Sequence, residues 1–266
     1  MHIEALLCVK LKGDAEMKKS IRLFVGILLI VLCVSVCFTG CESKFVRTIT
    51  PVGLCRYVQG GCTDGENLFV VMNDGKSGGK SSVIKYRLSD MKLLKTYKNL
   101  YFGHGNDVTY NSKTGQLIFT ESSPNGRNLH IYDAQTMAFI KTVTLQKSVY
   151  AIAYDEAEDC YYAGISGTTG IIRLNSAFAV TAEYAGGGKG YTKQGLDIVD
   201  NYLCFLRYDE NCVEIYTKDG IFVKEMSLPT DAFEPEFLCH LGDDYYVGYN
   251  LLTYTGGTIY RYRLDD

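Results

Sequence analysis

The residues best suited to chemistry in this chain are polar side chains at the starts of predicted strands. Five strands begin in this way, with Gln59, with Asn106 and Asp107, with Tyr150, with Gln194, and with Glu234 and Glu236. Neighbours in the sequence add His104 and the aromatic residues Tyr101, Phe102, Tyr191 and Phe233. A few converging polar groups beside aromatic walls are typical of a site for a small polar ligand. The alternative is structural, in which these residues hydrate a narrow channel or tie neighbouring strands together.

Three of these residues, Asp107, Glu234 and Glu236, are carboxylic acids. Paired carboxyl groups about 5–9 Å apart hydrolyse glycosidic bonds, with one of them acting as the acid. The same oxygens could hold Ca²⁺, although the chain contains no loop of the DxDxDG type. The sequence leaves both alternatives open and assigns no catalytic residue.

Other motifs for chemistry are weak. His104, His130 and His240 lie far apart, with no HxH or HxxxH spacing for a metal. His130 alternates with Leu129 and Ile131, which predicts an exposed strand position. The GGGKG segment at 186–190 lacks the Lys-Ser/Thr of a phosphate-binding loop. We therefore predict no metal and no cofactor.

The elements that must position these residues repeat along the chain. The segment FVRTIT at 45–50 has near-copies in LLKT at 93–96, FIKTVT at 139–144, FAVTAEY at 178–184 and FVKEMS at 222–227. The copies begin 48, 46, 39 and 44 residues apart. Each unit contains four predicted strands, and such a period is typical of β-propeller blades. The sequence therefore predicts an all-β chain.

The two ends of the repeat region complement each other. FVRTIT has no strands of its own before it, and the final TIYRYRL has no strand after it. We expect these segments to pair, so that the N-terminal strand closes the last blade of one propeller with five four-stranded blades at 45–266. A single blade cannot bury both of its faces, so blades pack around an axis. A pair of β-sandwiches would not explain the shared period.

The predicted connections fall into two groups at opposite ends of the blades. Short turns lie at 64–65, 111–115, 155–159, 200–201 and 219–220. Longer loops lie at 73–81, 101–105, 121–127, 186–193 and 251–257. Variable loops on a rigid scaffold commonly carry binding sites. The polar residues named above begin at the long-loop end, which is where we predict the site.

These repeats resemble the extracytoplasmic propellers of the NHL, YVTN and glutamine-cyclotransferase-like kind. The segment GHGNDVTYNSKTGQLIF at 103–119 is similar to a blade of secreted propeller proteins from Gram-positive bacteria. The resemblance covers nearly all of the predicted mature chain and implies its fold. Such folds occur in binding proteins and in enzymes alike, so it does not imply one activity.

The first forty residues look like a targeting segment. A cationic stretch at 17–22 precedes an apolar run at 23–38, and Thr39-Gly40-Cys41 follows. This resembles the lipobox of bacterial lipoproteins and implies a signal peptide at 1–40, with diacylglycerol on Cys41. Residues 1–16 carry three acidic side chains, so we expect translation to begin at Met17. The expected location is the outer face of the cell membrane; the alternative is an uncleaved helical anchor.

Charge and cysteine content narrow the class of protein. Without residues 1–40, 22 basic and 27 acidic side chains remain, a net charge of −5 with no basic stripe for nucleic acid. Besides Cys41, six cysteines remain, mostly in apolar runs, which predicts buried thiols: Cys55, Cys62, Cys160, Cys204, Cys212 and Cys239. Cys204 and Cys212 flank a predicted hairpin turn and are the pair best placed for a disulfide.

Taken together, these features favour a monomeric, membrane-anchored module. Residues 41–44 comprise the lipidated cysteine and a short linker, Glu42-Ser43-Lys44, that leads to the propeller. We expect the propeller to bind, or to act as a scaffold for, an envelope glycan, peptide or protein. The alternative is an enzyme at the channel mouth, either a glycosidase or a glutamine-cyclotransferase-like protein, that uses Asp107 and Glu236.

Overall fold

A computed structural model describes residues 43–76, 79–188, 193–207, 210–228 and 234–263. The predicted signal peptide, the start at Met17 and the lipidation of Cys41 lie outside the described residues. Within the described part of the chain, no helix is long and apolar enough to cross a membrane.

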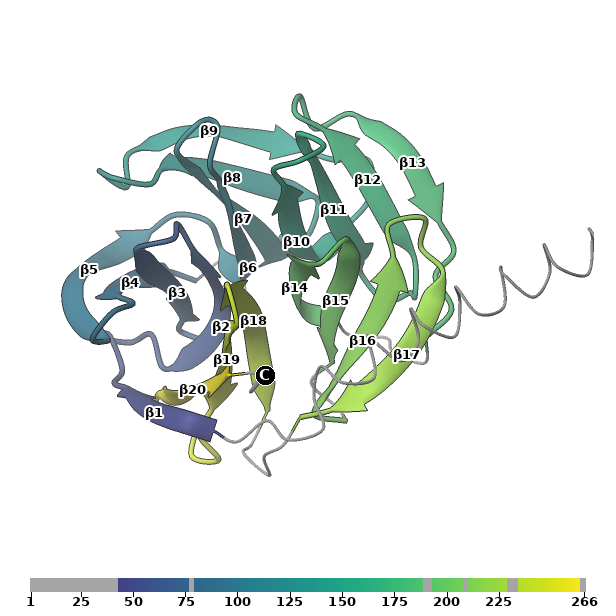
Figure 1. Cartoon of the computed structure of the whole chain (residues 1–266). Coiled ribbons are helices and arrows are strands. Elements are labelled where there is room, and N and C mark those ends of the chain that lie inside the picture. The colour runs from purple at the N-terminus through teal and green to yellow at the C-terminus, as the bar shows by residue number, and fades with distance from the viewer. Residues whose placement is uncertain (1–42, 77–78, 189–192, 208–209, 229–233, 264–266) are drawn as a thin grey trace, which may run out of the picture. The chain divides into compact units, whose positions relative to one another are not determined.

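The described chain forms five four-stranded antiparallel sheets, which are the blades of a β-propeller (Figure 1). Blade 1 contains β2 (Tyr57–Thr63), β3 (Asn67–Asn73), β4 (Ser81–Arg87) and β5 (Lys92–Leu100). Blade 2 contains β6 (His104–Asn111), β7 (Gln116–Ser123), β8 (Asn128–Asp133) and β9 (Phe139–Thr144). Blade 3 contains β10 (Val149–Asp155), β11 (Cys160–Ile165), β12 (Ile171–Asn175) and β13 (Val180–Tyr184). Blade 4 contains β14 (Lys193–Val199), β15 (Tyr202–Arg207), β16 (Cys212–Thr217) and β17 (Phe222–Ser227).

Blade 5 joins the two ends of the propeller. Its strands are β18 (Pro235–Leu241), β19 (Asp244–Asn250), β20 (Gly257–Arg263) and, on the outside, β1 (Ser43–Ile49). Strand β1 runs antiparallel to β20, with Thr48 opposite Thr258. The predicted closure by the N-terminal strand is therefore confirmed, and the strand begins two residues earlier than the sequence repeat indicated.

Inner strands of neighbouring blades lie against one another around the axis, in the order β2, β6, β10, β14 and β18. The apolar core fills the spaces between blades; Val58 and Met72 of blade 1, for example, share one cluster with Phe237 and Ile259 of blade 5. Burial of such side chains is the main stabilising term in folding. The first and last blades are thus joined by packing as well as by the β1–β20 pairing, and the inner strands are held on both sides.

Two sequence-based predictions about single residues are wrong. His130 is buried rather than exposed, because its Nε2 lies 2.8 Å from Glu121 Oε2 and Thr142 Oγ1 lies 3.0 Å from its Nδ1. Cys204 faces Ile215 across the hairpin while Cys212 faces Arg207, so the proposed disulfide pair is out of register. The six described cysteines are buried thiols that form no disulfide with one another, as their apolar surroundings predicted.

Candidate functional site at the long-loop mouth

A β-bulge positions a polar residue at the same place in every blade. The register between the first and second strands shifts at the residues that the sequence singled out, namely Gln59, Asn106 with Asp107, Tyr150, Gln194 and Glu236. A bulge leaves its extra residue outside the ladder and redirects its side chain. Five bulges at one level therefore turn five inner strands toward a common space.

That space is a cavity of about 580 Å³ at the long-loop end of the axis. Seven of the eight predicted ligand-binding residues line it: Gln59, His104, Asn106, Tyr150, Gln194, Glu234 and Glu236. Its other lining residues are Tyr57, Gly75, Ser122, Ser123, Asn250 and Tyr254. None of these lining residues is Lys or Arg, and two of them, Glu234 and Glu236, are acids.

Blades 1 and 2 contribute a linked pair of side chains. The Gln59 amide donates to Val58 O, so its Oε1 is free to accept a hydrogen bond from His104 Nε2 at 2.8 Å. That bond assigns the proton to Nε2 and leaves His104 Nδ1 as an acceptor. Burial lowers the pKa of His104, which keeps the imidazole neutral.

Asn106 connects blade 2 to the two blades beyond it. Its Nδ2 donates to Tyr150 O at 3.3 Å and to Gln194 O at 3.2 Å. Both amide protons are thereby used, and the side-chain oxygen remains as an acceptor at the cavity. His104 and Asn106 both line the cavity, so each brings a neutral acceptor to it.

The cavity lining also includes two carboxyl groups joined by an amide. Asn250 Nδ2 donates to Glu236 Oε1 at 2.6 Å and to Glu234 Oε2 at 3.1 Å, while Asn250 Oδ1 accepts from Val58 N. Glu236 is only 1% exposed, and its second oxygen, Oε2, has no protein partner in the described structure. Burial, and then the charge of Glu234, raise the pKa of Glu236 well above that of an ordinary carboxyl group.

Asp107 does not line the cavity, which corrects its prediction as a residue of the mouth. The blade 2 bulge contains two residues, so Asp107 points away from Asn106 and into the axis. Its Oδ2 accepts from Ile152 N at 2.9 Å and from Leu196 N at 3.2 Å, and its Oδ1 accepts from Val108 N. Asp107 therefore joins the inner strands of blades 2, 3 and 4, and a catalytic pair of Asp107 with Glu236 has no support in this geometry.

The aromatic walls also differ from the expectation. Phe102 is fully buried in the core beside Phe119, and Tyr101 is exposed outside the cavity, while Tyr191 and Phe233 lie outside the described residues. The aromatic wall consists instead of Tyr57 and Tyr254, whose ring centroids are 5.3 Å apart, together with Tyr150.

The sequence analysis missed Asn250 because it considered the start of the first strand in each blade and not the end of the second strand. Second strands return to the same mouth, and four of them end at or near a buried polar residue: Asn73, Glu121, Arg207 and Asn250. A polar residue that closes an apolar run at this position is a repeated pattern, and it could have been recognised in the sequence.

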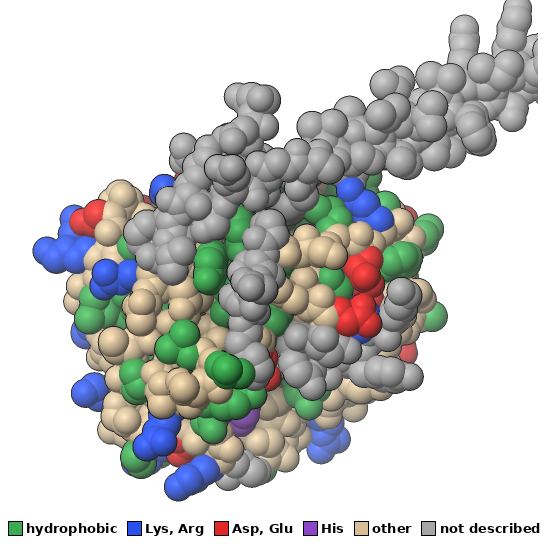
Figure 2. Space-filling view, turned by 90° about the horizontal axis from the view of Figure 1, so that it is seen from below, with side chains coloured by type: hydrophobic (Ala, Val, Ile, Leu, Met, Phe, Trp, Pro, Cys, Tyr) green, Lys and Arg blue, Asp and Glu red, His purple; other side chains and the backbone are tan. Residues whose placement is uncertain are grey.

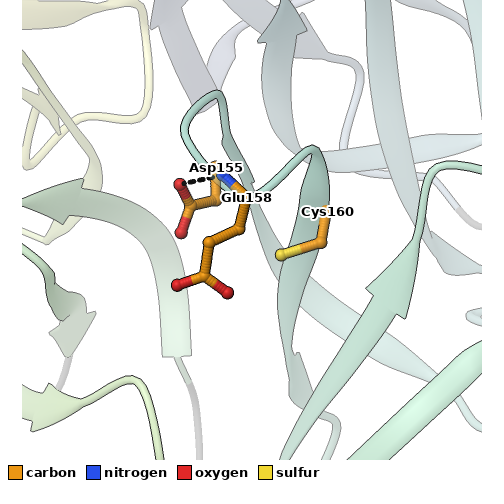
Figure 3. A group of neighbouring side chains, drawn as sticks. All are labelled: Asp155, Glu158 and Cys160. Atoms are coloured by element: carbon orange, nitrogen blue, oxygen red, sulfur yellow. Dashed lines mark hydrogen bonds between the residues drawn. The ribbon is translucent and has the colours of Figure 1, made fainter.

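Two clusters of side chains elsewhere have the composition of metal sites, but basic side chains already pair with their carboxylates. Asp155, Glu158 and Cys160 place their ligand atoms within 4.8 Å of one another, and Figure 3 shows them turned toward the same space. Lys218 contacts both carboxylates, and Arg173 Nη2 lies 2.8 Å from Glu158 Oε2. Burial raises the pKa of Cys160, so its thiol stays protonated and is a poor ligand. This cluster links blade 3 to blade 4 through ion pairs.

The second group, Glu210, Cys212 and Glu225, surrounds a buried arginine. Arg207 lies 3.3 Å from Glu210, 3.6 Å from Glu225 and 3.5 Å from Glu214. Burial raises the pKa of Cys212 to about 12, which again keeps the thiol protonated. The guanidinium supplies the positive charge in this group.

Comparison with known proteins supports the fold. No protein-family model and no curated protein sequence matches the chain. Glutaminyl cyclase from Myxococcus xanthus superposes with a TM-score of 0.64 at 9% identity, covering 84% of this chain and 95% of that one. The WD40 repeats of RRP9 give 0.52 at 11% identity, covering 79% and 78%. Streptogramin B lyase gives 0.50 at 15% identity, covering 84% and 74%. At these identities the likeness describes a β-propeller architecture, and function has to be argued from the cavity itself.

Proposed function

We propose that this protein is a membrane-anchored binding module whose long-loop cavity takes a small cationic ligand rich in hydrogen-bond donors, such as a primary amine on a peptide or amino sugar. The observation that carries the proposal is the buried Oε2 of Glu236, which lacks a partner among the described residues. A buried polar atom without a partner costs about 1–3 kcal/mol, and a ligand that bonds it recovers that free energy.

The other free groups of the cavity favour the same chemistry. His104 Nδ1 and Asn106 Oδ1 are acceptors, and Glu234 adds a second carboxylate beside Glu236. An ammonium group donates three hydrogen bonds and neutralises charge in one step. Its arrival favours the ionised form of Glu236, so binding should release a proton into solution.

Thermal-shift and calorimetric measurements test this proposal with primary amines, their N-acetylated counterparts and CaCl₂. We expect an amine to bind at least about tenfold more tightly than its acetylated form, a difference of ~1.4 kcal/mol. Glu236→Gln should abolish that preference, and Tyr101→Ala, which alters an exposed residue outside the cavity, should keep it. Stabilisation by CaCl₂ alone would identify a metal site instead, and no response to any probe would leave only a scaffold role.

The anchoring part of the proposal is supported by the order of a cationic stretch, an apolar run and Thr39-Gly40-Cys41 at 17–41. A diacylglyceryl group supplies two acyl chains, which is enough for stable attachment to a membrane. Cys41→Ser should move the protein from the membrane fraction to the soluble fraction. A variant that still partitions fully with membranes would favour the uncleaved helical anchor.

A second candidate function is catalysis by the same cavity. Burial raises the pKa of Glu236 well above that of an ordinary carboxyl group, which favours its protonated form, and Glu234 brings a second carboxyl group beside it; such a pair can transfer protons. The likeness of fold to a glutaminyl cyclase makes a peptide that begins with glutamine a sensible substrate to try. Mass spectrometry after incubation measures the reaction directly, and Glu236→Gln is the matched inactive control.

A further inference from the structure

The direction of β1 places the chain's N-terminal side at the end opposite the cavity. Strand β18 begins at the cavity, and each following strand of blade 5 reverses direction, so β20 ends and β1 begins at the short-turn end. Cys41 precedes Ser43 by two residues, which an extended chain spans in about 7 Å. A lipid on Cys41 would therefore hold this end close to the membrane.

The same end has a groove of about 670 Å³ between the first and last blades. Leu94 of β5 and Leu241 of β18 line it with 45% and 41% of their surface exposed, above a buried Leu88. Arg261 of β20 also lines the groove, and it lies opposite Phe45 of β1 in the register. The groove thus adjoins the strand that leads to the predicted anchor.

Exposed apolar residues continue along the short-turn end on both sides of blade 5. In blade 1, Leu93 stands beside Leu94 at the start of β5. In blade 4, the start of β17 exposes Phe222 and Val223, preceded by Ile221. Figure 2 shows a side of the molecule on which hydrophobic side chains are exposed among polar ones, with basic side chains toward the edges.

Charges around the groove are mixed and partly paired. Two basic residues, Arg87 and Arg261, and two acidic ones, Glu66 and Asp244, line the groove, and Arg87 Nε lies 3.1 Å from Asp90 Oδ1. Arg47 of β1 lies over the ring of Tyr86, 5.7 Å from its centroid, and exposed Lys92 and Lys95 flank the two leucines of β5. Exposed apolar side chains bordered by basic ones are typical of surfaces that rest in the lipid headgroup region.

We propose that the short-turn edge of blades 1 and 5 rests on the membrane that holds the N-terminus, with Leu94 and Leu241 in the interfacial layer and the cavity facing away from it. This inference depends on the lipid anchor proposed above. In this orientation the cavity opens away from the bilayer, toward ligands that approach from the aqueous side of the membrane.

The chain contains no tryptophan, so a single introduced Trp reports its own position without background. The test uses the full lipidated chain in phosphatidylcholine vesicles with and without brominated lipid. Leu241→Trp places the reporter at the groove, and Leu252→Trp places a matched one in the β19–β20 loop at the cavity end, where Leu252 is 73% exposed. We expect at least several-fold stronger quenching at position 241, with a blue-shifted emission.

The two ways of failing can be told apart. Equal quenching at both positions, or stronger quenching at position 252, in protein that does float with the vesicles overturns the orientation and leaves the anchor standing. Protein that does not float at all overturns the anchor and the orientation together. Circular dichroism of both variants confirms that the propeller is folded before quenching is measured.

Discussion

Asp107 and Glu236 are two buried carboxyl groups on bulges of inner strands, and they differ in their partners. Both are about 1% exposed, and burial raises the pKa of each well above the ordinary value. Asp107 receives three backbone N–H groups from three blades, so both of its oxygens are used. Glu236 receives a single side-chain amide and keeps one oxygen without a protein partner in the described structure.

The difference separates a structural acid, Asp107, from the acid that we propose binds the ligand, Glu236. An acid whose oxygens are filled by backbone donors holds strands together, and removing it leaves several buried donors unpaired. An acid with a free oxygen at a cavity has capacity left for a ligand. Burial and a perturbed pKa alone do not distinguish the two, because both residues show them. The hydrogen-bond partners do.

The largest effect should follow from removing Asp107. Asp107→Ala leaves the N–H groups of Ile152 and Leu196 without their acceptor inside the protein. At about 1–3 kcal/mol for each buried unpaired group, the free energy of unfolding should fall by about 3–5 kcal/mol. Urea denaturation measures the change. Asp107→Asn keeps one acceptor oxygen and should lose clearly less; equal losses would contradict the role assigned to the oxygens.

Asn250→Ala should have the next largest effect, because Asn250 serves both the fold and the cavity. The substitution unpairs Val58 N and removes the donor shared by Glu234 and Glu236. We expect about 2–3 kcal/mol less unfolding free energy, together with loss of amine binding. The matched variant is Asn73→Ala at the corresponding end of β3, which should lower stability without altering amine binding.

The contrast between these residues shows where sequence analysis succeeds. The repeats and the unmatched tails predicted five blades and their closure, because strand period and pairing follow from local patterns. The polar starts of the first strands predicted the residues that now line one cavity. The two-residue bulge was not visible, since it depends on the register with β7, and so Asp107 was placed one step out of position. The free oxygen of Glu236 likewise depends on contacts with Asn250 from another strand.

Glu236→Gln should change how the free energy of unfolding depends on pH more than it changes that free energy itself. Because the pKa of Glu236 is raised in the folded protein, the folded state keeps a proton that the unfolded chain has lost. Wild-type stability therefore falls as pH rises from the unfolded value near 4.3 toward the folded one, by about 1.4 kcal/mol for each unit of the shift.

The Gln side chain does not titrate, so that fall should be missing from the variant. Denaturation midpoints at pH 5 and pH 8 give the comparison, with Glu66→Gln, a rim residue of the opposite end, as control. At pH 8 the variant should be at least as stable as wild type. A variant with the full wild-type slope would mean that another group carries the proton.

The smallest effect should come from the opposite mouth, where His240 meets Asp197 and the sign of the pH dependence reverses. His240 Nδ1 lies 2.6 Å from Asp197 Oδ2 in a cavity of about 430 Å³. Burial lowers the pKa of His240, but the charge and hydrogen bond of Asp197 raise it by more. The net result is a pKa above the ordinary value for histidine. The pair therefore stabilises the fold below the unfolded pKa near 6.5, and this contribution disappears as pH rises through the folded pKa.

Because the side chains are partly exposed, His240→Gln should cost less than about 1 kcal/mol at pH 5.5 and nothing at pH 9. Amine binding should be unchanged; if it is lost, the two mouths are coupled and the division between a structural and a binding acid no longer holds.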